Sequence, residues 1–188
     1  MLRARPQESG RMHSTLVIVD MQNDFITGSL ASKEAEKVVP KIVERVKSGF
    51  YDDIFATRDT HLENYMDTLE GKKLPVPHCI KDTEGWQIQK DIGDALKEAD
   101  AYVQYIDKYT FGSLLLPTKI KDSTEQIDIV GVCTDICVVS NALSLRMFYP
   151  NMLIRVIADE CAGVTPELHE AALKVMQSCQ IDVVREDA

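Results

Sequence analysis

A buried-strand pattern that runs directly into a helical pattern is the strongest constraint on the fold of this chain. The stretch QIDIVGVCTDICVVSNALSLRMF begins with the continuous apolar run Ile127–Val132. A short apolar run without polar alternation is typical of a strand buried on both faces of a parallel sheet. From about Asp135 the spacing of apolar residues becomes helical and continues to about Tyr149. This stretch therefore predicts a fold of the α/β class.

The same alternation of strand and helix patterns continues along the chain. Further strands are predicted at Thr15–Val19, Asp53–Thr57, Tyr102–Ile106, Leu153–Ala158 and Ile181–Val184. Helices are predicted at Glu34–Lys47, Asp91–Ala99 and Leu114–Lys121, and from the Thr165 cap with Pro166 behind it to about Ser178. The intervening segment His61–Gln89 is predicted to be an irregular but ordered loop. The pattern indicates one parallel sheet covered by helices on both faces.

Length, charge and cysteine content restrict the class of protein. A chain of 188 residues is enough for one domain, which we place at residues 13–188, after a flexible extension at 1–12. The net charge of −9 argues against a nucleic-acid partner. No apolar run is long enough to span a membrane, so no membrane partner is expected. Five cysteines without a CxxC pair favour a reducing, cytoplasmic location.

Cys137 is a candidate nucleophile because it lies in the first turn of a helix that follows a buried strand. The free N–H groups and dipole of such a helix favour the thiolate and can hold an oxyanion. Asp20 and Lys108 each follow another predicted strand, and the carboxyl ends of parallel strands lie along one edge of a sheet. The carboxylate can take the thiol proton, and the ammonium lowers the thiol pKa. The alternatives are a buried apolar cysteine, a turn aspartate and a solvated lysine.

Five motifs resemble the isochorismatase-like cysteine hydrolases. They read LVIVDMQNDF, ATRDTH, PHC, DKYTFGSL and GVCTDICV, and they extend over nearly the whole chain. The resemblance implies a single-domain three-layer α/β/α fold with a six-stranded, mostly parallel sheet. It also implies a catalytic triad of Asp20, Lys108 and Cys137. A cis peptide between Val132 and Cys133 is implied, with the backbone N–H groups of Cys133 and Cys137 forming an oxyanion hole. A homo-oligomer, either a dimer or a tetramer, is expected on the same basis.

The segment after the second predicted strand looks like the metal site of the nicotinamidase branch of this family. Asp59, His61 and His78 match its ligands, and Glu70 resembles a fourth ligand found in some members. Two imidazoles with one or two carboxylates suit Zn²⁺, and also Mn²⁺ or Fe²⁺. The alternative is that these residues only cap local backbone. The site residues nearest a planar substrate are predicted to be Phe25, Trp86, Tyr109 and Val132, although core packing would explain each of them equally well.

The favoured function is an amidohydrolase that acts on a small carboxamide, nicotinamide above others, through a cysteine thioester. A first alternative is a metal-free family member that hydrolyses another small amide or ureido substrate. A second is a catalytically idle binding or assembly module. Isochorismate cleavage is disfavoured, because members that perform it do not use the cysteine nucleophile. His13 and His169 are expected to lie on the surface, and Cys79, Cys161 and Cys179 are expected to be structural.

Overall fold

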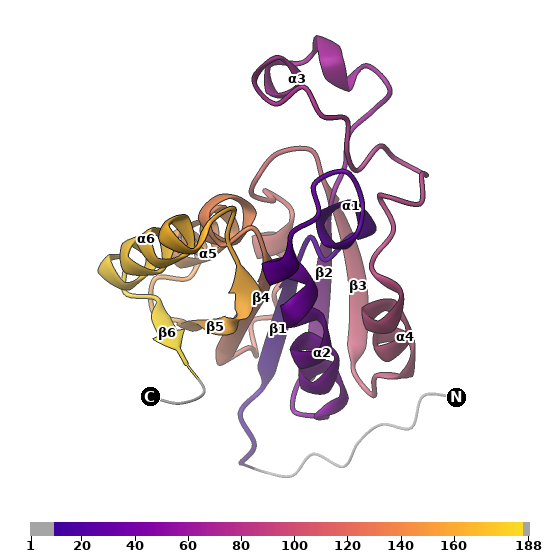
Figure 1. Ribbon diagram of the computed structural model, residues 1–188. Coiled ribbons are helices and arrows are strands. Elements are labelled where there is room, and N and C mark those ends of the chain that lie inside the picture. Colours follow the sequence, from indigo (N-terminus) through magenta and orange to yellow (C-terminus); the bar gives the residue numbers. More distant parts are fainter. Residues whose placement is uncertain (1–9, 186–188) are drawn as a thin grey trace.

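The computed structural model describes residues 10–185, and residues 1–9 of the predicted extension lie outside this range. Within it, six strands form one sheet in the order β3-β2-β1-β4-β5-β6, and every neighbouring pair is parallel. The strands are β1 (Ser14–Val19), β2 (Asp53–Asp59), β3 (Tyr102–Lys108), β4 (Gln126–Val132), β5 (Leu153–Ala162) and β6 (Asp182–Val184). All six strands fall where the sequence pattern predicts them, and Figure 1 shows the sheet with helices on both sides.

Two pairs of long helices cover the two faces of this sheet. Helices α2 (Lys33–Lys47) and α4 (Lys90–Glu98) pack on one face against alternate strand residues such as Leu16, Ile18 and Ile54. Helices α5 (Val139–Phe148) and α6 (Pro166–Ser178) pack on the other face against residues such as Val17 and Ile129. Successive strand residues point to opposite faces, so both sides of the central strands are buried and the fold is the expected three-layer α/β/α arrangement.

Short elements complete the chain. They are the helices α1 (Asn23–Ile26) and α3 (Leu69–Lys73), the 3-10 turns η1 (Tyr65–Asp67) and η2 (Leu116–Lys119), and the π-helical turn η3 (Thr134–Val138). The segment predicted to be irregular, His61–Gln89, contains η1 and α3, and Figure 1 shows α3 above the carboxyl ends of the strands. The helix predicted from Asp135 begins instead as the π-helical turn and becomes α-helical only at Val139.

The strand order reverses between β1 and β4, which makes this pair the switch point of the sheet. Ligand sites of open parallel sheets lie beside such a point, at the carboxyl ends of the strands. Gly131 allows the ends of β1 and β4 to approach closely. Its φ is +120°, and a Cβ atom built there would lie 2.1 Å from the carbonyl oxygen of Val19. Only glycine fits this position, so Gly131 brings the residues after β1 and β4 together.

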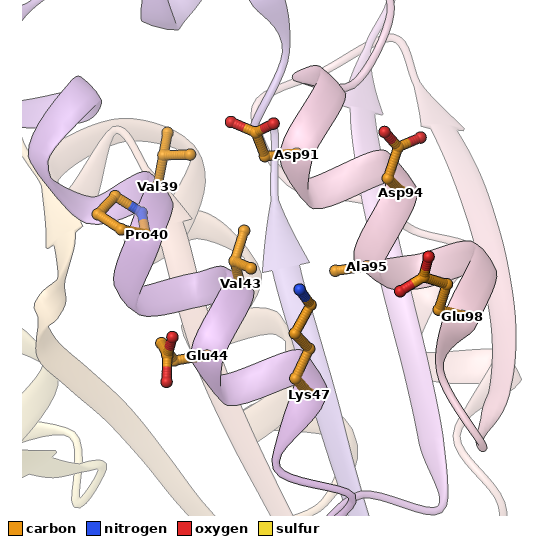
Figure 2. Close-up of a pocket in the computed structure, with 9 residues that line it drawn as sticks. All are labelled: Val39, Pro40, Val43, Glu44, Lys47, Asp91, Asp94, Ala95 and Glu98. Atoms are coloured by element: carbon orange, nitrogen blue, oxygen red, sulfur yellow. The ribbon is translucent and has the colours of Figure 1, made fainter.

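Two further observations concern the outside of the molecule. None of the helices in residues 10–185 combines the length and apolar character needed to cross a membrane. A groove runs between α2 and α4, with Val39, Pro40, Val43 and Ala95 among its apolar residues and Glu44, Asp91, Asp94 and Glu98 among its charged ones (Figure 2). No residue proposed from the sequence for catalysis or metal binding lines this groove.

Candidate active site

Asp20, Lys108 and Cys137, referred to below as the triad, converge at the carboxyl edge of the sheet. The Lys108 ammonium lies 2.7 Å from Asp20 Oδ2 and 3.5 Å from the Cys137 sulfur. All three residues are buried. They come from the ends of β1 and β3 and from η3, which is the convergence that the strand ends in the sequence predict.

Asp20 is held by the strand next to its own. Its φ is +51°, a conformation that aspartate tolerates better than most residues. Its backbone N–H donates to the Thr57 carbonyl at 3.2 Å, and the Thr57 hydroxyl donates to Asp20 Oδ1 at 2.7 Å. One carboxylate oxygen is thus fixed by Thr57, and the other faces Lys108. This arrangement leaves the carboxylate oriented toward the thiol.

Burial has the largest effect on the pKa values of Asp20 and Cys137. It raises the pKa of Asp20, and the positive charge of Lys108 lowers this pKa by less than burial raises it. Burial also raises the pKa of the Cys137 thiol well above its usual range, with a further contribution from Asp20. This differs from the expectation that the helix dipole and Lys108 lower the thiol pKa, because a buried thiolate loses its hydration. In the free protein Cys137 is therefore a thiol beside a carboxylate of increased basicity.

The turn that carries Cys137 is fixed by its own backbone and by one buried side chain. The peptide bond between Val132 and Cys133 is cis, as the resemblance implies. The Cys133 carbonyl accepts hydrogen bonds from the N–H groups of Ile136 and Val138, at 3.0 and 3.1 Å. The buried Asn141 side chain donates to the Cys137 carbonyl at 2.8 Å and accepts the N–H of Ser113 at 2.9 Å. Asn141 therefore ties the loop after β3 to the residue proposed as nucleophile.

Asp59, His61, Glu70 and His78 form a second group beside the triad, called the ligand cluster below. One potential ligand atom from each lies within 4.8 Å of the others. His61 Nε2 is 3.0 Å from Asp59 Oδ2, and Glu70 Oε1 is 3.7 Å from both His61 Nε2 and His78 Nε2. Lys108 joins the two groups, because its ammonium also lies 3.4 Å from Asp59 Oδ1.

The chemistry of the ligand cluster fits a divalent metal. Two imidazole nitrogens with two carboxylates are a common donor set for such ions. His78 Nδ1 lies 2.8 Å from the Val76 carbonyl, which can only accept, so Nδ1 carries the proton and Nε2 is left free to ligate. Burial alone would raise the pKa of Asp59, but the neighbouring imidazoles, His61 above all, and the charge of Lys108 lower it below its usual range. Asp59 is therefore an anion, as a metal ligand must be.

Gln22 and Asp24 hold the backbone that carries the ligand cluster, and neither is among the site residues predicted from the sequence. The buried Gln22 amide accepts from the Asp59 N–H at 2.7 Å and donates to the Asp59 carbonyl at 2.8 Å. The Asp24 carboxylate accepts from the Cys79 N–H at 2.7 Å, directly after His78. The signal was present in the motif MQNDF, where both polar residues follow the Asp20 strand end.

The residues predicted for a substrate pocket differ in position. Phe25 packs against His78, with ring centroids 5.6 Å apart. Val132 is buried at the end of β4, whereas Tyr109 is 60% exposed. Trp86 is buried beneath Arg58, whose guanidinium carbon lies 3.8 Å from the ring centroid. Its indole nitrogen donates to the Thr60 hydroxyl at 2.9 Å, so Trp86 packs as a support of the segment after β2.

Neither histidine expected on the surface is free there. His13 is partly buried and lies 2.6 Å from Asp53 Oδ2. His169 is partly buried in the first turn of α6, and its Nδ1 lies 2.8 Å from the Thr134 hydroxyl oxygen, next to the residue proposed for the oxyanion hole. The surface prediction was wrong for both, because each is covered by a segment distant in the sequence.

Comparison with known proteins places this site in context. The family model described as "Isochorismatase domain" matches residues 14–188. The nicotinamidase of Schizosaccharomyces pombe is 26% identical, covering 93% of this chain and 94% of its own, and the nicotinamidase/pyrazinamidase of Mycobacterium tuberculosis is 28% identical, covering 90% and 97%. The solved structure of the pyrazinamidase of Pyrococcus horikoshii in complex with zinc has a TM-score of 0.74 and 28% identity, covering 92% of this chain and 99% of its own.

Proposed function

The chain belongs to the isochorismatase family, and from this we propose that it is a nicotinamidase, which hydrolyses nicotinamide to nicotinate and ammonia. The single observation that carries the proposal is the position of Lys108. Its ammonium contacts Asp20, Cys137 and Asp59, and so joins a nucleophile and its base to a metal-type ligand cluster. The names of the similar proteins from Schizosaccharomyces pombe and Mycobacterium tuberculosis agree with this substrate class.

In the proposed mechanism, Asp20 is the general base and later the general acid. It takes the proton from Cys137, which its raised pKa favours, and the thiolate attacks the amide carbon. The backbone N–H groups of Cys133 and Cys137 hold the oxyanion. Asp20 then gives this proton to the amide nitrogen, which leaves as ammonia while the thioester forms. Afterwards Asp20 takes a proton from the water that attacks the thioester and returns it to the Cys137 sulfur as nicotinate is released. Lys108 keeps its positive charge throughout, since the neighbouring anions raise its pKa above the usual range.

We also propose that the ligand cluster holds Zn²⁺, with Mn²⁺ and Fe²⁺ as chemically acceptable substitutes. Asp59, His61, Glu70 and His78 would be the ligands, and the bound ion would supply an open Lewis-acid position for the ring nitrogen of the substrate. Phe25 beside His78 would then form one wall for the ring. His61→Gln should reduce the zinc content of the purified protein and raise KM together. Normal zinc content in this variant would exclude His61 as a ligand.

Ammonia release from nicotinamide by the zinc-loaded protein tests the function directly. Wild-type protein should release ammonia, and Cys137→Ala should lower kcat by at least about 10⁴-fold, because the attack step loses its nucleophile. The variant should still fold, since it removes one buried sulfur and its contact with Lys108, which keeps Asp20 and Asp59 as partners. Absence of release from folded, zinc-loaded wild type would remove nicotinamide as the substrate. A fully active Cys137→Ala protein would remove the cysteine mechanism.

The remaining expectations are proposals of the same kind. We propose residues 13–188 as one catalytic domain that follows a short N-terminal extension, and a homo-oligomer, either a dimer or a tetramer, as the working form. A cytoplasmic location is supported by the cysteines Cys79, Cys133, Cys137, Cys161 and Cys179, all of which are free.

A further inference from the structure

The turn from Cys133 to Cys137, called the nucleophile turn, is hydrogen-bonded to the start of α6. The Thr134 side chain is fully buried, and its hydroxyl oxygen lies 2.8 Å from His169 Nδ1. The next residue, Asp135, accepts the N–H of Val164 at 2.9 Å. Two consecutive residues of the turn are thus hydrogen-bonded to the first turn of α6 and to the connection between β5 and α6.

His169 is itself fixed in place by its helix. Its backbone N–H donates to the Thr165 carbonyl at 2.9 Å, in the turn where Thr165 also caps α6. A Cβ atom built on Gly163 would lie 2.9 Å from both His169 Cβ and Asp135 Oδ1. The backbone at Gly163 therefore packs so closely against His169 and Asp135 that a larger residue would not fit there. The imidazole is held with its Nδ1 edge against Thr134, and its side chain is only 15% exposed.

The hydrogen bond has consequences for the turn, because Thr134 has no exposure to water. A buried hydroxyl that loses its partner is destabilised, so Thr134 would move to recover one. Any movement of Thr134 is transmitted to its neighbour Cys133, and through the turn to Cys137. The burial of His169 lowers its pKa and so favours the neutral ring, in which Nδ1 can accept the Thr134 proton.

We propose that His169 is a positioning residue of the reaction: through its hydrogen bond to Thr134 it holds the nucleophile turn so that the Cys137 sulfur and the N–H groups of Cys133 and Cys137 meet the same substrate carbonyl. This rests on the proposed function. His169 acts through Thr134 and touches neither substrate nor metal. Its removal should therefore affect the chemical step, since displacements of about 1 Å can cost on the order of 100-fold in rate, and leave substrate binding at the ligand cluster intact.

Matched variants at both ends of the hydrogen bond test the proposal. His169→Leu and Thr134→Val remove it, whereas His169→Asn and Thr134→Ser keep a polar atom in place. Glu170→Gln is the control, because this exposed neighbour lies 4.0 Å from the other ring nitrogen. For each protein, kcat and KM for nicotinamide are measured with zinc content. The rate at which iodoacetamide alkylates Cys137 is followed by mass analysis of the peptide, as a readout independent of substrate.

His169→Leu should lower kcat about tenfold or more with KM and zinc content unchanged, and the alkylation rate of Cys137 should fall in parallel. Thr134→Val should do the same. The double variant should be no slower than the worse single variant, since both changes remove one interaction. His169→Asn, Thr134→Ser and Glu170→Gln should stay close to wild type. If His169→Leu fails to fold, Thr134→Val still tests the proposal, together with His169→Asn and Thr134→Ser, which keep a polar atom at each position.

Wild-type kcat and alkylation in folded His169→Leu or Thr134→Val would overturn the proposal. Additive losses in the double variant would overturn it also, as would a rise in KM with loss of zinc. The two hypotheses fail separately. If no protein releases ammonia but the alkylation rates follow the expected order, the nicotinamidase function fails and the positioning role stands. If wild type is active and the variants equal it, the positioning role fails alone.

Discussion

Asp20 and Asp128 are both fully buried carboxylates on neighbouring parallel strands, but their surroundings differ. Asp128, in the middle of β4, is bound by Arg155 through both oxygens at 2.7 Å, by the Tyr51 hydroxyl at 2.6 Å and by Gln126 at 3.1 Å. Asp20, beyond the end of β1, has one hydroxyl and one ammonium as partners, and a thiol beside it. Burial is common to both, so burial does not mark the reactive group. The difference is that Asp20 lies beside the Cys137 thiol, which can give up a proton to it, whereas both oxygens of Asp128 are occupied by structural hydrogen bonds.

Asp20→Asn gives the largest expected effect. The variant keeps the shape and the Thr57 contact but removes the proposed base, so kcat should fall by about 10⁴-fold, as it does when the aspartate of a catalytic triad is replaced by asparagine. The free energy of unfolding should change by about 1 kcal/mol or less, because Lys108 keeps the Asp59 carboxylate and the Thr110 carbonyl as partners. Ammonia release and urea unfolding measure the two effects. A kcat within about tenfold of wild type would show that another group is the base.

Asp128→Asn should produce the opposite result. Removing one charge from a buried network leaves Arg155 without its anion, which should lower the free energy of unfolding by about 3 kcal/mol. The kcat of the folded fraction should stay within about twofold of wild type, since the network is not in contact with the triad. Asp107→Asn is the matched control. Its ion pair with Arg58 is partly exposed, and its loss should cost less than about 1 kcal/mol. A large fall in kcat for Asp128→Asn would contradict the assignment of Asp128 to stability and of Asp20 to catalysis.

The pH profile of kcat/KM should show the smallest effect. Burial raises the Asp20 pKa above the value of about 4 that is usual for aspartate. Because the base must be ionised, activity should be present above this raised pKa and should fall as the pH drops through it. The acid limb should therefore lie above pH 4, and Asp128→Asn should not move it. A limb at or below the usual aspartate value would contradict the role given to burial.

The sequence predicts the framework of the site well because the framework depends on strand ends. Three predicted strands followed by Asp20, by Lys108 and by the stretch leading to Cys137 are sufficient to place those residues on one edge of a parallel sheet. The ligand cluster was predicted from resemblance and from spacing within one segment, and the structure brings all four residues together. Their roles in catalysis and metal binding stay predictions until the variants are measured.

The features that the sequence does not predict depend on contacts between distant segments. The pKa of Cys137 depends on how deeply the turn is buried and on Asp20, and a local helix argument includes neither. The partner of His169 comes from another strand connection. In each case the neighbours in space, and not those along the chain, decide the outcome.

The two halves of the site also differ in how much of the chain must be folded to make them. All four members of the ligand cluster come from β2 and the segment that directly follows it, whereas the triad needs the ends of β1 and β3 and the turn after β4. Closing the longer loops costs more chain entropy. If the ligand cluster holds zinc as proposed, zinc content should report mainly on β2 and the segment that follows it, whereas turnover should report on nearly the whole chain. A preparation that binds a full equivalent of zinc without activity would indicate chains whose C-terminal strands have not docked.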